Sequence, residues 1–329
     1  MDRQSTEEII SCLDGTRTVL PYYRDRYSIG LLRQLSRNHR NVPLRVAALK
    51  QSRYAPLLQK PRVKTALARL GNQPLDDLFL AAHDHDPDQE YFVLTLGTWG
   101  NEQGARYRLQ QTSRPGLNLV LQLNLSREHD SHYRKLGCPL SQFNYRGHPV
   151  STQRNTLAWA RIDLDWKTGC ALIEEIQSDW VRRVDWLAGR VDRRLACGHA
   201  PDAPLNLWGL QCALKTARTY CAHVLDRYAS IWAEATLWAT LQFIRDELGI
   251  CHVFYHSETG GRLLKGIRHT APPRSLYTDL PRRFCLMSTE DAPEFLQRDP
   301  DARRILRRHP GLSFFRLDPV LGSANESGN

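Results

Sequence analysis

The sequence predicts an α+β protein with a mixed, mostly antiparallel sheet, packed helices and a basic helical segment at the N-terminus. Three observations predict this: helically spaced residues before residue 80, β-branched and aromatic runs between residues 91 and 177, and long helical patterns after residue 206. Hydrophobic residues make up 41% of the 329 residues and charged residues 24%, fractions that exclude a wholly disordered chain and a coiled coil.

The basic segment comes first. From Arg17 to Arg69 the chain holds thirteen Lys and Arg and a single acid, Asp25. Apolar residues at helical spacing alternate with these charges, and prolines divide the segment into short helices. Tyrosines lie between the arginines, a pattern that suits phosphate contact and base stacking. A solvated helical face and an acidic protein partner are the alternatives. The candidate nucleic-acid-binding residues are Arg33, Arg37, Arg40, Arg45, Lys50 and Arg53.

A polar loop at residues 83–90 ends the helical segment. We therefore expect a basic helical segment at 1–85, an α+β core domain at 86–318 and a disordered tail at 319–329. The core domain begins with an antiparallel meander, continues with a long loop, and then forms a hairpin. The expected strands are residues 91–96, 107–112, 119–125, 157–164 and 170–177, and the expected long loop is 128–149.

The second half of the core domain is mainly helical. A helical pattern covers residues 206–248, and its second part, 229–244, is apolar nearly all round, which predicts a buried helix. Gly249 ends this pattern. A strand at 250–255 and a short helix at 275–284 follow.

Composition also bears on the compartment. The eight cysteines include no CxxC pair, which favours a reducing compartment and no disulfide framework. The N-terminal residues lack the apolar core of a secretory signal. The most apolar stretch, residues 229–244, is shorter than the roughly 20 residues that cross a bilayer. We expect a soluble cytoplasmic protein that makes no membrane contact.

The most informative stretch is the end of the strand at 170–177. Glu175, Gln177 and Asp179 alternate along the chain and so share one face, where two clustered carboxylates are costly to bury without partners. Such a pair raises one pKa and produces a general acid or base. The alternative is that these acids pair with Arg161, Arg182 or Arg183, or that Ser178 or Asp179 caps the next helix.

A second candidate is the glycine turn after the strand at 250–255. Exposed backbone N–H groups in such a turn can hold an anion, with basic residues close behind. The candidate cofactor-binding residues are His256, Ser257, Glu258, Thr259, Gly260, Gly261 and Lys265. The alternatives are a plain turn with polar side chains in solvent, and a metal held by His252, His256 and Glu258, for which a fourth ligand is missing.

The third candidate is the short helix at 275–284. Tyr277 would serve as a phenolic acid, and Arg282 and Arg283 would bind phosphate. The alternative is that the tyrosine packs in the core and the arginines are solvated.

Residues 173–180, IEEIQSDW, closely resemble the EEIQSDW signature of the large polyvalent proteins of bacteriophages and conjugative elements. In that family a hairpin strand of the LAHVR kind precedes the signature, as residues 157–163 do here. A PxAP segment and a long helix follow it, as 201–204 and 205–223 do here. A FYDKxLPxxL stretch comes last, and residues 276–284 resemble it.

The family's element order is similar to the core of GCN5-related acyltransferases, so the resemblance implies an acyltransferase-like enzyme. Glu175 would deprotonate an amine, Gln177 and Asp179 would orient it or the substrate, and Tyr277 would protonate the leaving thiolate. The glycine turn would contact a phosphate of acetyl-CoA or another acyl-CoA. The Q/RxxGxG/A loop of those acyltransferases is not present at residues 180–189.

Two other functions stay open. A non-catalytic nucleic-acid-binding or defence-related module would use the arginines of the N-terminal helices, and its affinity would fall steeply with salt. A metal-dependent hydrolase would use the carboxylates together with His256.

Overall fold

The structure is a computed structural model that describes residues 1–13, 19–39, 43–101, 110–138, 142–145, 147–267 and 273–317. Its centre is an eight-stranded sheet in the order β1-β2-β3-β4-β5-β8-β10-β9, and only β5 and β8 are parallel neighbours within it. The mixed, mostly antiparallel sheet of an α+β fold is thereby confirmed. The strands are β1 (Val19–Tyr22), β2 (Glu90–Asn101), β3 (Gly116–Asn124), β4 (Thr156–Asp165), β5 (Cys170–Gln177), β8 (His252–His256), β9 (Met287–Thr289) and β10 (Phe314–Leu317).

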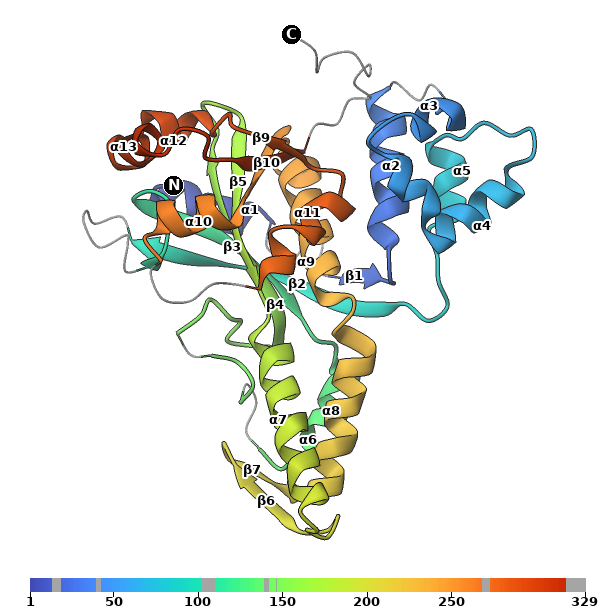
Figure 1. Cartoon of the computed structure of the whole chain (residues 1–329), viewed down its shortest axis with the longest axis vertical. Coiled ribbons are helices and arrows are strands. Elements are labelled where there is room, and N and C mark those ends of the chain that lie inside the picture. Colours follow the sequence, from blue (N-terminus) through green and yellow to red (C-terminus); the bar gives the residue numbers. More distant parts are fainter. Residues whose placement is uncertain are drawn as a thin grey trace.

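Helices cover both faces of the sheet (Figure 1). On one face α9 packs across β4 and β5, while α7 and α8 extend away from the sheet as a pair with the β6–β7 hairpin at their far end. On the other face α10, α12 and α13 enclose a smaller core that contains Leu172, Phe254 and Leu264. These elements are α7 (Asp179–Ala196), α8 (Leu214–Tyr228), α9 (Trp232–Gln242), α10 (Glu258–Lys265), α11 (Asp279–Arg283), α12 (Glu294–Arg298), α13 (Pro300–Arg308), β6 (Pro204–Leu207) and β7 (Leu210–Ala213).

The N-terminal segment is helical, as predicted, but two of its elements lie against the sheet. Strand β1 pairs with β2, and α1 packs on β3. The remaining helices form a group beside the sheet (Figure 1). The N-terminal helices are α1 (Arg3–Leu13), α2 (Arg26–Asn38), α3 (Val46–Lys50), α4 (Pro61–Leu70) and α5 (Asp77–Ala82).

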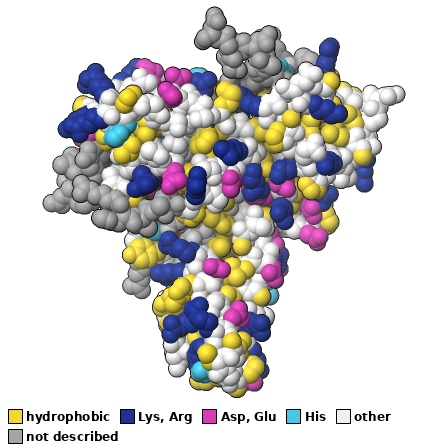
Figure 2. Space-filling view, viewed as in Figure 1, with side chains coloured by type: hydrophobic (Ala, Val, Ile, Leu, Met, Phe, Trp, Pro, Cys, Tyr) yellow, Lys and Arg dark blue, Asp and Glu magenta, His cyan; other side chains and the backbone are white. Residues whose placement is uncertain are grey.

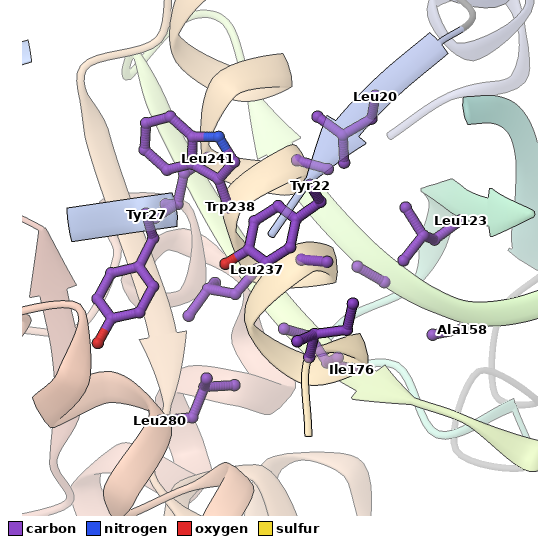
Figure 3. Packing of buried hydrophobic residues seen from close by; sticks show 14 of the residues in the cluster. Leu20, Tyr22, Tyr27, Leu123, Ala158, Ile176, Leu237, Trp238, Leu241 and Leu280 are labelled. Carbon is purple, nitrogen blue, oxygen red and sulfur yellow. The ribbon is translucent and has the colours of Figure 1, made fainter. Parts of the chain in front are cut away.

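The helical group is joined to the main core through α2 and α9. Tyr22 and Tyr27 lie beside Trp238 and Leu241 of α9 (Figure 3), and all four are buried in one hydrophobic cluster. A side chain at Gly30 would meet the Trp238 ring, because a Cβ there would lie 2.2 Å from the ring atoms. Glycine therefore sets how closely α2 approaches α9.

Buried charges strengthen the same junction. Glu234 of α9 accepts a hydrogen bond from the backbone N–H of Asp25 at 2.7 Å and pairs with Arg283. Lys60 pairs with Asp25 at 2.9 Å. Burial raises the pKa of Glu234 to about 7, although Arg283 acts in the opposite direction. Arg283, a candidate phosphate ligand, is thus occupied within the fold.

Several expected elements differ. Residues 128–149 were expected to form a loop, yet α6 (Arg127–Arg134) lies there, with acids in its first turn, His and Arg in its last turn, and Tyr133 buried. The helical pattern expected from residue 206 begins only at Leu214, because Trp208 and Gly209 both have positive φ and turn β6 into β7.

The remaining differences concern short elements. The helix expected at 275–284 is split into a 3-10 turn and α11, since Tyr277 adopts a non-helical conformation between them. Of the strand expected at 107–112, residues 110–112 are not in a strand, and 107–109 lie outside the described residues. The tail at 319–329 also lies outside them.

Gly30→Ala is expected to destabilise the protein by about 1–3 kcal/mol, because the added methyl forces the buried Trp238 ring to move. Thermal or urea unfolding measures the change.

The matched control is Gly189→Ala on α7, where a Cβ would meet only the end of the Arg193 side chain at 3.6 Å. This variant is expected to be more stable by about 0.5–1 kcal/mol, since alanine is the better helix former. Equal effects of the two substitutions would contradict the close approach of α2 to α9.

Candidate functional site

The polar end of β5 lies over an irregularity in the sheet. Arg161 of β4 stands opposite Glu175 and Ile162 stands opposite Ile173, so Glu174 is the extra residue of a β-bulge. The parallel pairing of β5 with β8 stops at Ile173. Both carboxylates therefore sit where the ladder between β5 and β8 ends, at the carboxyl side of the two strands.

Glu174 is the centre of a fully buried polar group. Its carboxylate accepts hydrogen bonds from the backbone N–H and the hydroxyl of Ser113, at 3.0 and 2.8 Å, and lies 3.2 Å from His256 Nε2. The Ser113 hydroxyl is also 2.8 Å from the same His256 nitrogen. Burial would raise the pKa of Glu174, but the hydrogen bond and charge of His256 lower it to about 2.

This serine, histidine and glutamate do not form a nucleophilic triad. In such a triad the serine and the carboxylate bind different ring nitrogens, whereas here both contact Nε2 of His256. All three side chains are also completely buried. Ser113 and His256 thus satisfy the buried carboxylate at the bulge, and the geometry does not activate a nucleophile.

Glu175 forms a second charged group. Its carboxylate pairs with Arg161 and lies 3.4 Å from Lys265 Nζ, which also donates to the Glu174 carbonyl at 3.1 Å. Burial would raise the pKa of Glu175, but the positive charges of Lys265 and Arg161 lower it to about 2. Glu175 thus stays ionised at neutral pH and takes up a proton poorly, which argues against the role of general base.

Asp179 is joined to a histidine that the sequence did not single out. The Asp179 carboxylate is 2.6 Å from His148 Nδ1, and it accepts hydrogen bonds from Gln177 Nε2 at 2.8 Å and Arg182 at 2.6 Å. The Asp179 side chain is 2% exposed and that of His148 is 25% exposed. Burial opposes ionisation of Asp179, but the His148 hydrogen bond outweighs it and lowers the pKa.

The structure therefore divides the predicted catalytic residues. Gln177 and Asp179 meet around His148, whereas Glu175 belongs to the Arg161 and Lys265 group. The predicted alternative is also found in part, because Glu175 pairs with Arg161, Asp179 pairs with Arg182, and Ser178 caps α7. No sequence signal indicated His148, which lies in an irregular polar stretch.

Tyr277 is buried and packs on Tyr255, with ring centroids 5.6 Å apart. Burial raises its pKa well above the ordinary value, so the phenol holds its proton tightly. The structure thus agrees with the alternative interpretation of this residue, in which the tyrosine packs in the core.

The glycine turn is the first turn of α10 and is closed. Ser257 caps this helix and accepts from the Gly260 N–H through its hydroxyl and from the Gly261 N–H through its carbonyl. A Cβ at Gly260 would lie 3.0 Å from the Ser257 hydroxyl and 3.1 Å from the Ser313 carbonyl. His256, Gly260, Gly261 and Lys265 are buried. The N–H groups of Gly260 and Gly261 are therefore not open to a phosphate, whereas Ser257 and Glu258 are partly exposed and Thr259 is exposed.

Part of the positive charge of the basic helices is paired with acids of the following segment. Arg33 and Arg37 both pair with Asp77, at 2.7 and 2.9 Å, and Arg26 pairs with Asp84 at 2.9 Å. Arg53 donates to Tyr54 and to the Met287 sulfur. Arg45 and Lys50 are exposed, and Arg40 lies outside the described residues. The tyrosines expected to stack on bases are core residues: Tyr22, Tyr23, Tyr27 and Tyr54 are all buried.

Two absences among the described residues bear on other classes of function. No cluster of three or more His, Cys, Asp or Glu side chains there could hold a metal ion. No helix among them is long and apolar enough to cross a membrane.

No family model, curated protein or solved structure matches this chain. The resemblance of residues 173–180 to the EEIQSDW signature thus stays a prediction.

Glu175→Gln is expected to lower stability at neutral pH by about 3 kcal/mol, because it leaves the buried Arg161 and Lys265 charges without their counter-ion. The carboxylate has a lowered pKa in the folded state, so its contribution is complete above its ordinary value of 4.5 and is lost as the pH falls toward about 2. The difference in the free energy of unfolding between wild type and variant should therefore become smaller in acid, as measured by urea unfolding.

Glu294→Gln is the matched control, because Glu294 forms an exposed pair with Arg298. We expect a loss below about 1 kcal/mol at every pH. A Glu175→Gln variant as stable as this control would show that the buried pair contributes nothing.

Proposed function

We propose that this chain is an acyltransferase-like enzyme in which His148, oriented by Asp179, takes a proton from an amine-bearing substrate. The observation that supports this most directly is the 2.6 Å contact between His148 Nδ1 and the buried Asp179 carboxylate. In a neutral imidazole, a carboxylate on Nδ1 favours the Nδ1–H tautomer, whose Nε2 has a lone pair; Gln177 Nε2 also lies 3.2 Å from Nδ1. Because the imidazole is partly exposed, that lone pair is accessible to a substrate.

The surroundings of Asp179 fit a positioning role. Gln177 and Arg182 donate to one carboxylate oxygen, and His148 approaches the other. Three partners hold the carboxylate ionised and fixed, so it stabilises the imidazolium that forms when His148 accepts a proton. Gln177 and Asp179 keep the orienting role expected of them, while the base becomes His148 in place of Glu175.

The position in the sheet gives independent support. Asp179 follows the carboxyl end of β5, six residues beyond Ile173, where the parallel pairing with β8 stops, and His148 contacts it there. Ligands of open α/β sheets gather at this position. The resemblance implies a hairpin, a signature strand, a long helix at 205–223 and a further strand. The hairpin and the strands correspond to β4, β5 and β8, and the helix to α8, which begins only at Leu214; α7, the β6–β7 hairpin and α9 also lie between β5 and β8.

In the proposed reaction, His148 Nε2 removes a proton as the amine nitrogen bonds to the acyl carbon. The bond from that carbon to the leaving group then breaks, and the proton passes from the imidazolium to the leaving group. The acyl donor is an activated acyl compound. The Gly260 and Gly261 N–H groups are bonded to Ser257, so they do not contribute to binding that donor.

His148→Gln is expected to slow acetyl transfer about 100-fold or more, since a positioned general base contributes roughly 10²–10⁴ to the rate. The assay supplies acetyl-CoA or 4-nitrophenyl acetate with spermidine or a lysine peptide, and mass spectrometry detects the acetylated amine. The matched control is His252→Gln, at an exposed histidine that begins β8. Absence of product with every pair, or equal rates for wild type and His148→Gln, would overturn the proposed function.

The orienting role of Asp179 has its own readout. In ¹⁵N NMR spectra the wild-type His148 ring should carry its proton on Nδ1, and Asp179→Asn should shift the population toward the Nε2–H tautomer. If the His148 tautomer is the same in wild type and Asp179→Asn, Asp179 has a purely structural role.

A further inference from the structure

A continuous row of stacked aromatic rings and guanidinium groups runs along the outer side of α7. Two tryptophans are at its centre: Trp186 of α7 and Trp208 at the tip of the β6–β7 hairpin, with ring centroids 4.6 Å apart and planes inclined by 27°. We call this set the stacked row. Its members, in order, are Arg190, Trp186, Trp208, Arg183, Tyr145 and His148.

Guanidinium groups alternate with the rings. Arg190 lies 5.4 Å from the outer face of Trp186, and Arg183 lies between Trp208 and Tyr145, at 5.6 and 5.7 Å. Arg183 is held in place, because it donates to the backbone carbonyls of residues 142 and 144. Arg190 is exposed, and its guanidinium lies over the Trp186 indole. One end of the row is fixed and the other can rearrange.

The rings are exposed to an unusual degree. Trp186 is 42% exposed, Trp208 38% and Tyr145 49%. Aromatic side chains carry the largest apolar surface of any residue and are normally buried well beyond this. Contiguous exposed aromatics mark a surface that binds something.

The backbone at the hairpin tip points to the same conclusion. Trp208 has φ 51° and Gly209 has φ 75°. A turn with two positive φ values favours Asn-Gly or Asp-Gly, and a bulky side chain at its first position is strained. The strain places the Trp208 ring on Trp186, where it remains solvent-accessible, and such strain is typical of ligand sites.

Helix α7 carries five arginines and three aspartates, so its net charge is +2, and Arg182 among the arginines pairs with Asp179. Arg182, Trp186, Arg190 and Arg193 recur every three or four residues of α7 and so follow one face of the helix. Figure 2 shows Lys and Arg side chains next to hydrophobic ones on the lower part of the molecule, where Figure 1 places α7 and the hairpin. The ligand should therefore combine flat apolar rings with negative charge.

We propose that the stacked row binds single-stranded nucleic acid. A base would stack on the outer face of Trp186 in place of Arg190, whose guanidinium would move to a neighbouring phosphate. Stacking on aromatic rings flanked by arginines is how single strands are held without regard to sequence. A paired duplex hides its base faces, and a neutral sugar or proline-rich peptide would leave the arginines without partners.

This site differs from the basic N-terminal helices, and it does not rest on the proposed acyl transfer. Trp186 and Trp208 take no part in the proton transfer at His148. Failure of one proposal therefore leaves the other standing.

The test measures binding of a fluorescent oligothymidylate of about 20 nucleotides to the full chain, at about 50 and about 200 mM salt. Wild type should bind with an affinity that falls with salt. Trp186→Ala and Trp208→Gly should each weaken binding about five-fold or more. Trp208→Gly also relieves the strain at φ 51°, so its fold should be at least as stable as wild type, which separates lost binding from lost folding.

Two control variants locate the surface. Trp166→Ala removes another exposed tryptophan, 48% exposed, in the turn between β4 and β5, and should leave binding unchanged. The double variant Arg45→Ala with Lys50→Ala tests the N-terminal helices and should also have little effect.

Three outcomes would overturn the proposal. The first is no binding of the oligonucleotide by wild type. The second is binding that survives Trp186→Ala and Trp208→Gly but is lost in the Arg45 and Lys50 variant. The third is a change in oligomeric state with these tryptophan variants but no oligonucleotide binding, which would make the row a contact between protein chains.

Discussion

The structure depends on the compensation of two neighbouring glutamates at the end of β5, of which Glu174 is buried and Glu175 largely so. Burying a carboxylate in a sheet costs several kcal/mol unless counter-charges and donors surround it. Ser113 and His256 surround Glu174, while Arg161 and Lys265 surround Glu175. These partners come from four separate parts of the chain. The polar network therefore fixes the position of β4, β8 and α10 around one strand.

The same arrangement explains the division of roles at the carboxyl end of β5. Glu174 is held by hydrogen bonds from Ser113 and His256 and Glu175 by ion pairs with Arg161 and Lys265, and the lowered pKa of each carboxylate keeps it ionised at neutral pH. Beyond Gln177 the chain leaves the sheet, and Asp179 supports a histidine that reaches solvent. The carboxylates of Glu174 and Glu175 and the candidate base His148 lie near the same end of β5, but only His148 is exposed enough to meet a substrate.

The sequence predicted those features that depend on local periodicity. The strands at residues 119–125, 157–164 and 170–177 and the buried α9 follow from apolar patterns that local propensity and burial both favour. It could not predict partners that meet only through the tertiary fold. His148 and Ser113 lie in irregular segments whose spacing carries no signal, and the β-bulge that places Glu174 cannot be read from alternation. The N-terminal tyrosines, in turn, have the spacing of a nucleic-acid surface, but all four are buried, and Tyr22 and Tyr27 lie beside α9.

The parallel pair of β5 and β8 has a consequence for biosynthesis. The chain leaves the sheet after Gln177 and returns only at His252. During synthesis, β5 is therefore an exposed edge strand until β8 has been made. An exposed edge strand can pair with the strands of other chains, and charged side chains in the strand oppose that pairing. Glu174 and Glu175 would then disfavour aggregation of the nascent polypeptide until the C-terminal residues are synthesised and pack over them.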